Sequence, residues 1–111
     1  MKILIFLGTR PEVIKMAPII SLVSNDSDFE VFICSTGQHR EMLDQTLKVF
    51  NISPDLDLNL MRVNQDLSTL SAELLLGASN IITKVKPHLV LVHGDTTSGM
   101  CAALASFYAR V

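Results

Sequence analysis

Short apolar runs and segments with helical apolar spacing alternate along this 111-residue chain. The run Lys2–Leu7 (KILIFL) is typical of a strand buried on both faces, and apolar residues then recur at helical spacing from Pro11 to Val23. Residues 29–36 (FEVFICST) predict a second strand. Residues 37–52 predict a second helix with one apolar stripe.

The second half of the chain continues this alternation. Residues 55–61 (DLDLNLM) alternate polar and apolar side chains, which predicts an extended segment with one wet face near a sheet edge. Apolar spacing over residues 66–86 predicts the longest helix, which stops before a proline. Residues 89–92 predict a further buried strand, and residues 100–110 a helix rich in small side chains.

Strands separated by helices imply one α/β domain over residues 1–111. We expect a Rossmann-like, mostly parallel sheet with right-handed crossovers and helices on both faces. In that strand order the first and fourth strands are neighbours, and ligands bind outside their carboxyl ends. The loops Gly8–Glu12 and Gly94–Ser98 should therefore meet at one rim of the sheet.

Composition limits the kinds of partner. Hydrophobic residues make up 49% and charged residues 18% of the chain, against about 25% charged residues in an ordinary soluble domain, so we expect part of the surface to be covered. A net charge of -2 with no Lys or Arg run argues against nucleic acid. Cys34 and Cys101 predict buried, reduced thiols. Without a signal-peptide core or an apolar stretch of ~20 residues, we expect a cytoplasmic chain with no membrane partner.

The first loop carries two cations at a helix start. Gly8 allows a sharp turn, Pro11 fixes the helix entry, and Arg10 and Lys15 are suited to an anionic ligand. A charge-assisted hydrogen bond contributes about 1.5 to 3 kcal/mol, more than the helix dipole at about 0.3 to 1 kcal/mol. The alternative is a capped helix with solvated charges, in which Lys15 pairs with Glu12 at the surface. The loop matches neither a dinucleotide fingerprint nor a Walker motif.

The polar residues of the two loops are suited either to cap the following helices or to bind a ligand and take part in catalysis. Thr9 and Glu12 have capping-box spacing, and either Asp95 or Thr96 is suited to cap the last helix. His93 and the hydroxyls that follow it lie where they would also line the same crevice. The three histidines have no spacing typical of a metal site, so we expect none.

Four motifs together identify a family resemblance. GTRPEVIKMAP (8–18), TGQHREMLDQ (36–45), DLDLN (55–59) and KPHLVLVHGDTTS (86–98), in this order, closely resemble the N-terminal domain of non-hydrolysing bacterial UDP-N-acetylglucosamine 2-epimerases. The resemblance implies a glycosyltransferase-B-like architecture with the nucleotide sugar between two Rossmann-like domains. This chain would be the N-terminal half, apparently truncated, with the second domain absent. We expect residues 1–111 alone to be inactive.

The resemblance also implies a reaction and the residues that serve it. The enzymes interconvert UDP-N-acetylglucosamine and UDP-N-acetylmannosamine for surface polysaccharides, by eliminating UDP and adding it back after C2 is protonated from the other face. Arg10 and Lys15 match substrate-binding positions, and Asp95 matches a carboxylate implicated in substrate binding and acid/base catalysis. No metal or redox cofactor is implied, and members form homodimers.

An activator site in some members is represented here by Gln38 alone. Glu41 and Asn64 stand where activated members can carry Gln and Arg, which argues against allosteric activation. Two other functions stay open at this point. One is a UDP- or phosphate-binding module without catalysis, and the other is a different glycosyltransferase-B-like enzyme acting on a related nucleotide sugar.

Overall fold

The computed structural model describes residues 1–37, 40–60 and 64–111, and its core is a four-stranded parallel sheet with the strand order β3-β2-β1-β4. Along the chain the elements are β1 (Lys2–Leu7), α1 (Arg10–Ser24), β2 (Glu30–Ser35), α2 (Arg40–Val49), β3 (Leu56–Asp57), α3 (Leu67–Val85), β4 (Leu89–Leu91) and α4 (Thr97–Tyr108). The predicted α/β, Rossmann-like order of strands and helices is confirmed.

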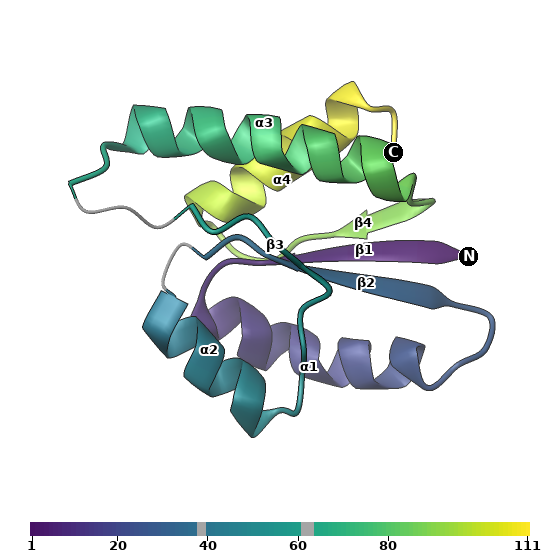
Figure 1. Ribbon diagram of the computed structural model, residues 1–111. Coiled ribbons are helices and arrows are strands. Elements are labelled where there is room, and N and C mark those ends of the chain that lie inside the picture. The colour runs from purple at the N-terminus through teal and green to yellow at the C-terminus, as the bar shows by residue number, and fades with distance from the viewer. Residues whose placement is uncertain (38–39, 61–63) are drawn as a thin grey trace.

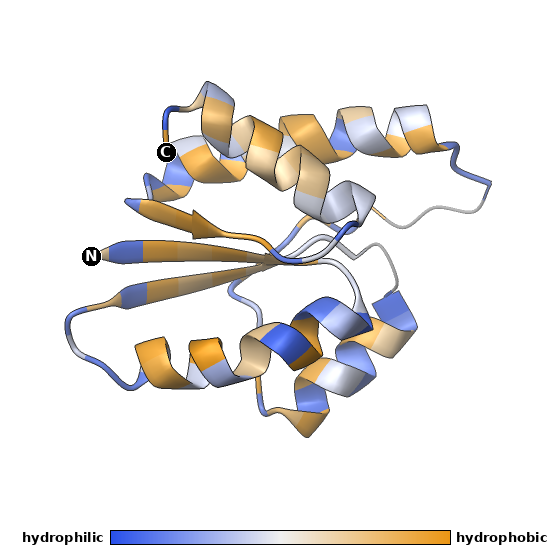
Figure 2. Cartoon of the chain, turned by 180° about the vertical axis from the view of Figure 1, so that it is seen from behind, coloured by the Kyte–Doolittle hydropathy of each residue, from blue (hydrophilic) through white to orange (hydrophobic). Residues whose placement is uncertain are grey.

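Two helices cover each face of the sheet. α1 and α2 lie on one face and α3 and α4 on the other (Figure 1). Side chains of the central strand β1 alternate between the two layers, because successive residues of a strand point to opposite faces. Ile5 packs with α1 and α2, whereas Phe6 packs with α3 and α4. The strands are hydrophobic along most of their length (Figure 2), as expected for a sheet covered on both sides.

The predicted burial holds for one edge strand, β3, and fails for the other, β4. Residues 55–60 alternate between exposed and partly buried positions, so the predicted wet face near an edge is confirmed, although only Leu56–Asp57 form the ladder. The prediction that residues 89–92 are buried was wrong. β4 is the other edge of the sheet, and Leu89 and Val92 are 40% and 36% exposed because no described strand lies beside its outer edge.

A polar contact fixes the start of α2 against the end of β3. The Arg40 guanidinium donates two hydrogen bonds of 2.7 Å to the carboxylate oxygens of Asp57 and one of 3.0 Å to Asn59 Oδ1. Gly37, with φ +71°, lets the backbone pass close to this cluster, because a Cβ there would lie 2.7 Å from Arg40 Nη2. The cluster therefore sets where the chain turns after β2.

The predicted meeting of two loops follows from the sheet register. β4 pairs with β1 in parallel, with Leu89 opposite Ile3 and Leu91 opposite Ile5. The carboxyl ends of both strands therefore lie at one rim, and the loops that follow them are neighbours. None of the helices in the described ranges is long and apolar enough to cross a membrane.

Candidate functional site

Gly8 directly follows β1, at a point where three segments of the chain come into contact. A Cβ on this residue would lie 2.5 Å from Ser98 Oγ and 2.8 Å from Thr36 Oγ1. Those two hydroxyls are themselves 2.9 Å apart and hydrogen-bonded, and both residues are only 1% exposed. The glycine is needed here for close approach, and Ser98 joins the sheet to α4 rather than lining a crevice.

The capping alternatives are resolved in favour of Thr96 and Glu12. Thr96 is the N-cap of α4, and its Oγ1 accepts a hydrogen bond of 3.2 Å from the N–H of Gly99. At the start of α1, the Glu12 carboxylate accepts a hydrogen bond of 2.5 Å from the N–H of Thr9. Thr9 Oγ1 has no hydrogen-bond partner among the described residues, so the carboxylate side of the predicted capping box carries the cap.

Arg10 lies beside a hollow of about 350 Å³ at the rim shared by the two loops. The hollow is bounded by residues from the β1–α1 turn, the start of α2 and the loop before α4: Thr9, Arg10, Pro11, Met42 and Thr96. The exposed Arg10 guanidinium has no hydrogen-bond or ion-pair partner within the described part of the chain. It is therefore available to a ligand.

Lys15 projects from another flank of α1. Five positions separate it from Arg10, so the two side chains leave the helix about 140° apart at about 100° per residue. Lys15 is exposed and does not line the hollow beside Arg10. The alternative, a surface pair between Lys15 and Glu12, is not formed, because Glu12 is 2% exposed and its carboxylate is directed inward. Whether Lys15 reaches the same ligand as Arg10 stays a prediction.

Asp95 is exposed in the loop between β4 and α4, one residue before the cap of α4. Its carboxylate has no hydrogen-bond or ion-pair partner among the residues that the structure describes. Nearby, His93 Nδ1 is buried and also lacks a partner in the described ranges. Asp95 thus follows β4 at the same rim of the sheet where Arg10 follows β1, and its role in a reaction stays a prediction.

Two further expectations concern the loop after β2 and metal binding. Gln38, the activator-site residue suggested by resemblance, lies outside the described residues. Within the described ranges, no three His, Cys, Asp or Glu side chains gather closely enough to hold a metal ion.

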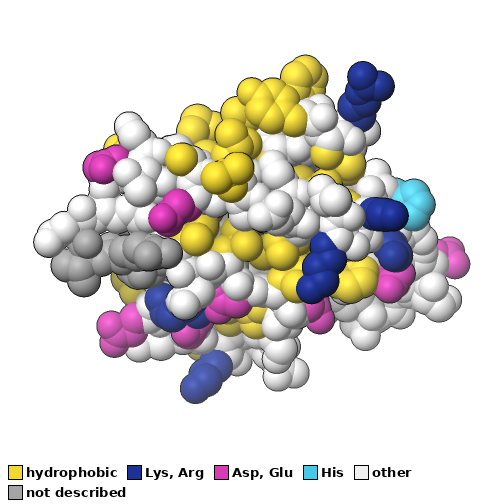
Figure 3. Space-filling model, turned by 45° about the horizontal axis from the view of Figure 1, so that its top comes forward, with side chains coloured by type: hydrophobic (Ala, Val, Ile, Leu, Met, Phe, Trp, Pro, Cys, Tyr) yellow, Lys and Arg dark blue, Asp and Glu magenta, His cyan; other side chains and the backbone are white. Residues whose placement is uncertain are grey.

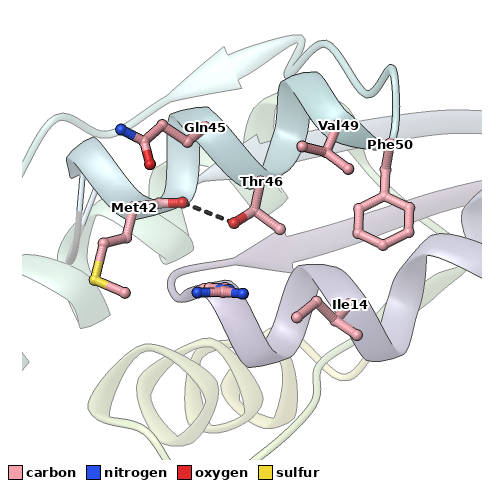
Figure 4. Close-up of a pocket in the computed structure, with 7 residues that line it drawn as sticks. Ile14, Met42, Gln45, Thr46, Val49 and Phe50 are labelled. Atoms are coloured by element: carbon pink, nitrogen blue, oxygen red, sulfur yellow. Dashed lines mark hydrogen bonds between the residues drawn. The ribbon is translucent and has the colours of Figure 1, made fainter.

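A second hollow, of about 380 Å³, lies between α1 and α2 and is mostly apolar (Figure 4). Ile14 of α1 faces Val49, the last residue of α2, and Phe50, which follows it, across this hollow (Figure 4). Thr46 contributes no free hydroxyl hydrogen, because its Oγ1 donates a hydrogen bond of 2.8 Å to the carbonyl of Met42. Its remaining lining residues are Arg10, Met42 and Gln45. Arg10 thus borders both hollows.

The two cysteines are the buried, unpaired thiols that the sequence predicts. Burial, with a smaller contribution from the negative charge of Asp57, raises the pKa of the Cys34 thiol to about 12. Burial also raises the pKa of Cys101, whose Sγ contacts the carbonyl of Ser71. Because the thiolate is the reactive form, neither cysteine is suited to nucleophilic chemistry.

Two side-chain contacts of this rim were missed by sequence reasoning. Thr36 was interpreted only as the end of a strand, although its hydroxyl holds Ser98. Glu12 was assigned to local capping, although it also contacts Thr96, 84 positions away. The capping-box spacing was the one sequence signal that pointed to Glu12.

Comparison with known proteins places the chain among nucleotide-sugar epimerases. The family model described as UDP-N-acetylglucosamine 2-epimerase matches residues 22–111. The UDP-N-acetylglucosamine 2-epimerase of Campylobacter jejuni is 52% identical over 110 residues, and that of Escherichia coli K12 is 50% identical over 111 residues. These alignments include the loop with Arg10 and Lys15, which the family model does not reach.

Solved structures agree with the sequence comparison. The UDP-GlcNAc 2-epimerase of Neisseria meningitidis, described as bound to UDP-GlcNAc, matches 99% of this chain with a TM-score of 0.91 and 45% identity. That of Methanocaldococcus jannaschii, described as in complex with UDP-GlcNAc and UDP, gives a TM-score of 0.92 at 30% identity. This chain covers about 30% of each of those chains.

This chain matches only one part of each relative. The chain is covered almost completely, but it spans 29% and 30% of the length of the C. jejuni and E. coli proteins, and it corresponds to their N-terminal part. The family model, the sequence identity and the fold all point the same way. The chain therefore belongs to the UDP-N-acetylglucosamine 2-epimerase family.

Proposed function

We propose that this chain supplies the N-terminal half of the substrate cleft in an enzyme that interconverts UDP-N-acetylglucosamine and UDP-N-acetylmannosamine. The observation that carries the proposal is the Arg10 guanidinium, which has no partner among the described residues and lies beside the hollow where the loops after β1 and β4 meet. Family relatives whose descriptions name UDP-GlcNAc or UDP support a nucleotide sugar as the ligand. The products are proposed to serve surface polysaccharide synthesis, in the cytoplasm, where reduced thiols such as Cys34 and Cys101 persist.

Each proposed site residue has a role that its chemistry supports. Arg10 and Lys15 bind the diphosphate and stabilise the negative charge that UDP carries as it leaves, because fixed cations offset developing charge without reorganisation. Asp95 contacts the sugar and exchanges the C2 proton. In the elimination step, a base takes the C2 proton, the C2–H electron pair forms the C1–C2 double bond, and the C1–O bond breaks with its electron pair going to the leaving UDP. An acid on the opposite face then protonates C2, and the UDP oxygen bonds to C1 again, which completes the inversion at C2.

The reaction needs more than this chain. Residues 1–111 hold one side of the proposed cleft, and the relatives are more than three times longer. We therefore expect no interconversion by residues 1–111 alone. A suitable test is a chimera in which these residues replace the matching N-terminal part of the C. jejuni relative.

Substitutions in that chimera test the roles of two residues. Asp95→Asn should lower kcat by about 10² to 10⁴, the usual contribution of a positioned proton-transfer group. Arg10→Ala should chiefly raise KM for UDP-N-acetylglucosamine, by about 10- to 100-fold, because a charge-assisted hydrogen bond is lost. Asp28→Asn and Lys84→Ala, at exposed positions away from the rim, are matched controls.

The outcomes separate the proposed function from its alternatives. Near-normal kinetics in both Asp95→Asn and Arg10→Ala would remove the site assignment. A chimera that binds UDP in calorimetry without epimerising would favour a binding module, and turnover of a different UDP-sugar would favour a related enzyme.

We also propose that the enzyme is a homo-oligomer, with the outer face of α4 in the interface. Its exposed side chains are almost all apolar: Met100, Ala103, Leu104, Phe107 and Tyr108. Hydrophobic side chains gather over the layer of α3 and α4 (Figure 3). Exposed apolar patches of this kind are typical of interaction sites.

A further inference from the structure

Glu12 is a buried carboxylate whose partners lie on both loops of the rim. Its exposed fraction is 2%, and Oε2 accepts hydrogen bonds from the N–H groups of Gly8 (2.7 Å) and Thr9 (2.5 Å). Oε1 accepts a third hydrogen bond, of 2.6 Å, from the hydroxyl of Thr96. Within the described residues, no Lys or Arg pairs with it. Three well-directed donors satisfy the charge in place of a cation.

The same contact connects the starts of two helices. Thr96 Oγ1 accepts a hydrogen bond from the N–H of Gly99 in the first turn of α4 and donates its own hydrogen to Glu12 in the first turn of α1. The path therefore runs Gly99 N–H, Thr96 hydroxyl, Glu12 carboxylate, Thr9 N–H. Chains of hydrogen bonds of this kind hold their members in one arrangement.

Both loops contact the residues of this path. Gly94 has φ +89°, and a Cβ on it would lie 3.7 Å from Glu12 Cγ, so this loop lies next to the Glu12 side chain. The backbone of Gly8 packs against the side chains of Ser98 and Thr36. Arg10 and Asp95 are the immediate neighbours of residues in this assembly, so its geometry sets how far apart they stand.

We infer that Glu12 and Thr96 are positioning residues for the reaction. Their hydrogen bond fixes the separation of the Arg10 and Asp95 backbones across the rim. This inference rests on the proposed function, because Arg10 and Asp95 are the groups it positions. Glu12 itself is unsuited to touch substrate, since it is 2% exposed and both of its oxygens are occupied by protein donors.

Substitutions of Thr96 separate positioning from stability. In the chimera with the C. jejuni relative, Thr96→Val removes the hydroxyl at nearly constant volume, whereas Thr96→Ser keeps it. Thr96→Val should lower kcat about 10- to 100-fold, because displacing a catalytic group by about 1 Å has an effect of this size. It should change KM less than about threefold. Thr96→Ser should keep kcat within about threefold of the wild-type chimera.

A matched control accounts for the helix cap that Thr96→Val also removes. Asp66 caps α3 by accepting a hydrogen bond from the N–H of Thr69, and Asp66→Ala removes that cap at a helix that does not line the hollow beside Arg10. This variant should lower Tm and leave kcat unchanged when assayed well below its Tm. A purely structural role for Thr96 predicts that Thr96→Val behaves in the same way, and that result would overturn the inference. Equal losses in Thr96→Val and Thr96→Ser would overturn it as well.

Hydrogen exchange provides a readout that does not depend on turnover. Peptides covering residues 8–13 and 94–99 of the chimera should both exchange faster in Thr96→Val than in Thr96→Ser. If the wild-type chimera lacks epimerase activity, the proposed function fails, and the exchange rates still test the connection between the loops. Unchanged exchange in residues 8–13 would then overturn the inference, because the two loops would not depend on each other.

Discussion

At the scale of single residues, the side chains at the rim of the sheet are closely packed. Gly8 is the clearest case, because its missing Cβ is what lets Ser98 and Thr36 approach β1. Both neighbours are almost completely buried, so neither can move into solvent to relieve a clash. The conformation of Gly8 is thus less important here than its size.

Gly8→Ala should therefore destabilise the protein. Inserting a methyl group 2.5 Å from Ser98 Oγ overpacks the site, and overpacking costs about 1 to 3 kcal/mol, measured as the free energy of unfolding in urea. Gly77→Ala is the control, because its Cβ would meet only the flexible tip of Leu58 at 3.2 Å and alanine is favoured inside a helix by about 1 kcal/mol. A Gly8→Ala protein as stable as the wild type would show that the residues around Gly8 can accommodate a methyl group.

At the scale of elements, the Arg40–Asp57 pair joins α2 to β3. The hydrogen bonds from Arg40 are the main cause that holds the pKa of Asp57 below its usual range, with a smaller contribution from the N–H of Asn59. A carboxyl group with a lowered pKa in the folded state stabilises the protein above its ordinary pKa. That stabilisation is lost as the pH falls through the folded-state pKa.

Arg40→Met should reveal this pH dependence. At pH 7 the variant should lose about 1 kcal/mol or less, because the Asp57 side chain is 42% exposed and solvent screens the pair. The difference in unfolding free energy between variant and wild type should shrink as the pH falls below about 4. Lys84→Met, which removes an exposed cation without a described ion pair, should show no such convergence. Urea unfolding between pH 3 and pH 7 gives the comparison, and a constant difference would contradict the assignment.

At the scale of the whole molecule, the exposed side chains of α4 form an apolar face. The outer face of α4 leaves Phe107 75% and Tyr108 64% exposed next to other apolar residues, whereas exposed apolar residues of α1 such as Leu22 lie on the other side of the sheet. The low charge content anticipated a covered surface, and this face is the part of the described chain that fits that expectation best.

Phe107→Lys combined with Leu104→Gln should shift the chimera towards the monomer. A charge placed in an apolar interface loses hydration without gaining a partner, so the associated form is disfavoured. Sedimentation velocity at several concentrations measures the change, and Leu22→Gln on the opposite face serves as the control. An oligomer unaffected by the double substitution would exclude α4 from the interface.

The sequence by itself determined the order of the elements, the parallel sheet and the rim shared by the loops of Arg10 and Asp95. Those features follow from local periodicity and from the handedness of strand-helix-strand connections, both of which can be inferred from neighbouring residues. Four motifs also sufficed for the family, because their combination is distinctive.

Only the tertiary structure decided the exposure of β4 and the long-range pairs of side chains. Thr96 meets Glu12 across 84 positions, and Arg40 meets Asp57 across 17. Such contacts are sensitive to differences in distance of a few tenths of an ångström, and they depend on rotamers that no local pattern encodes. The sequence therefore predicted which loops meet, whereas folding of the whole chain determined which atoms hold them together.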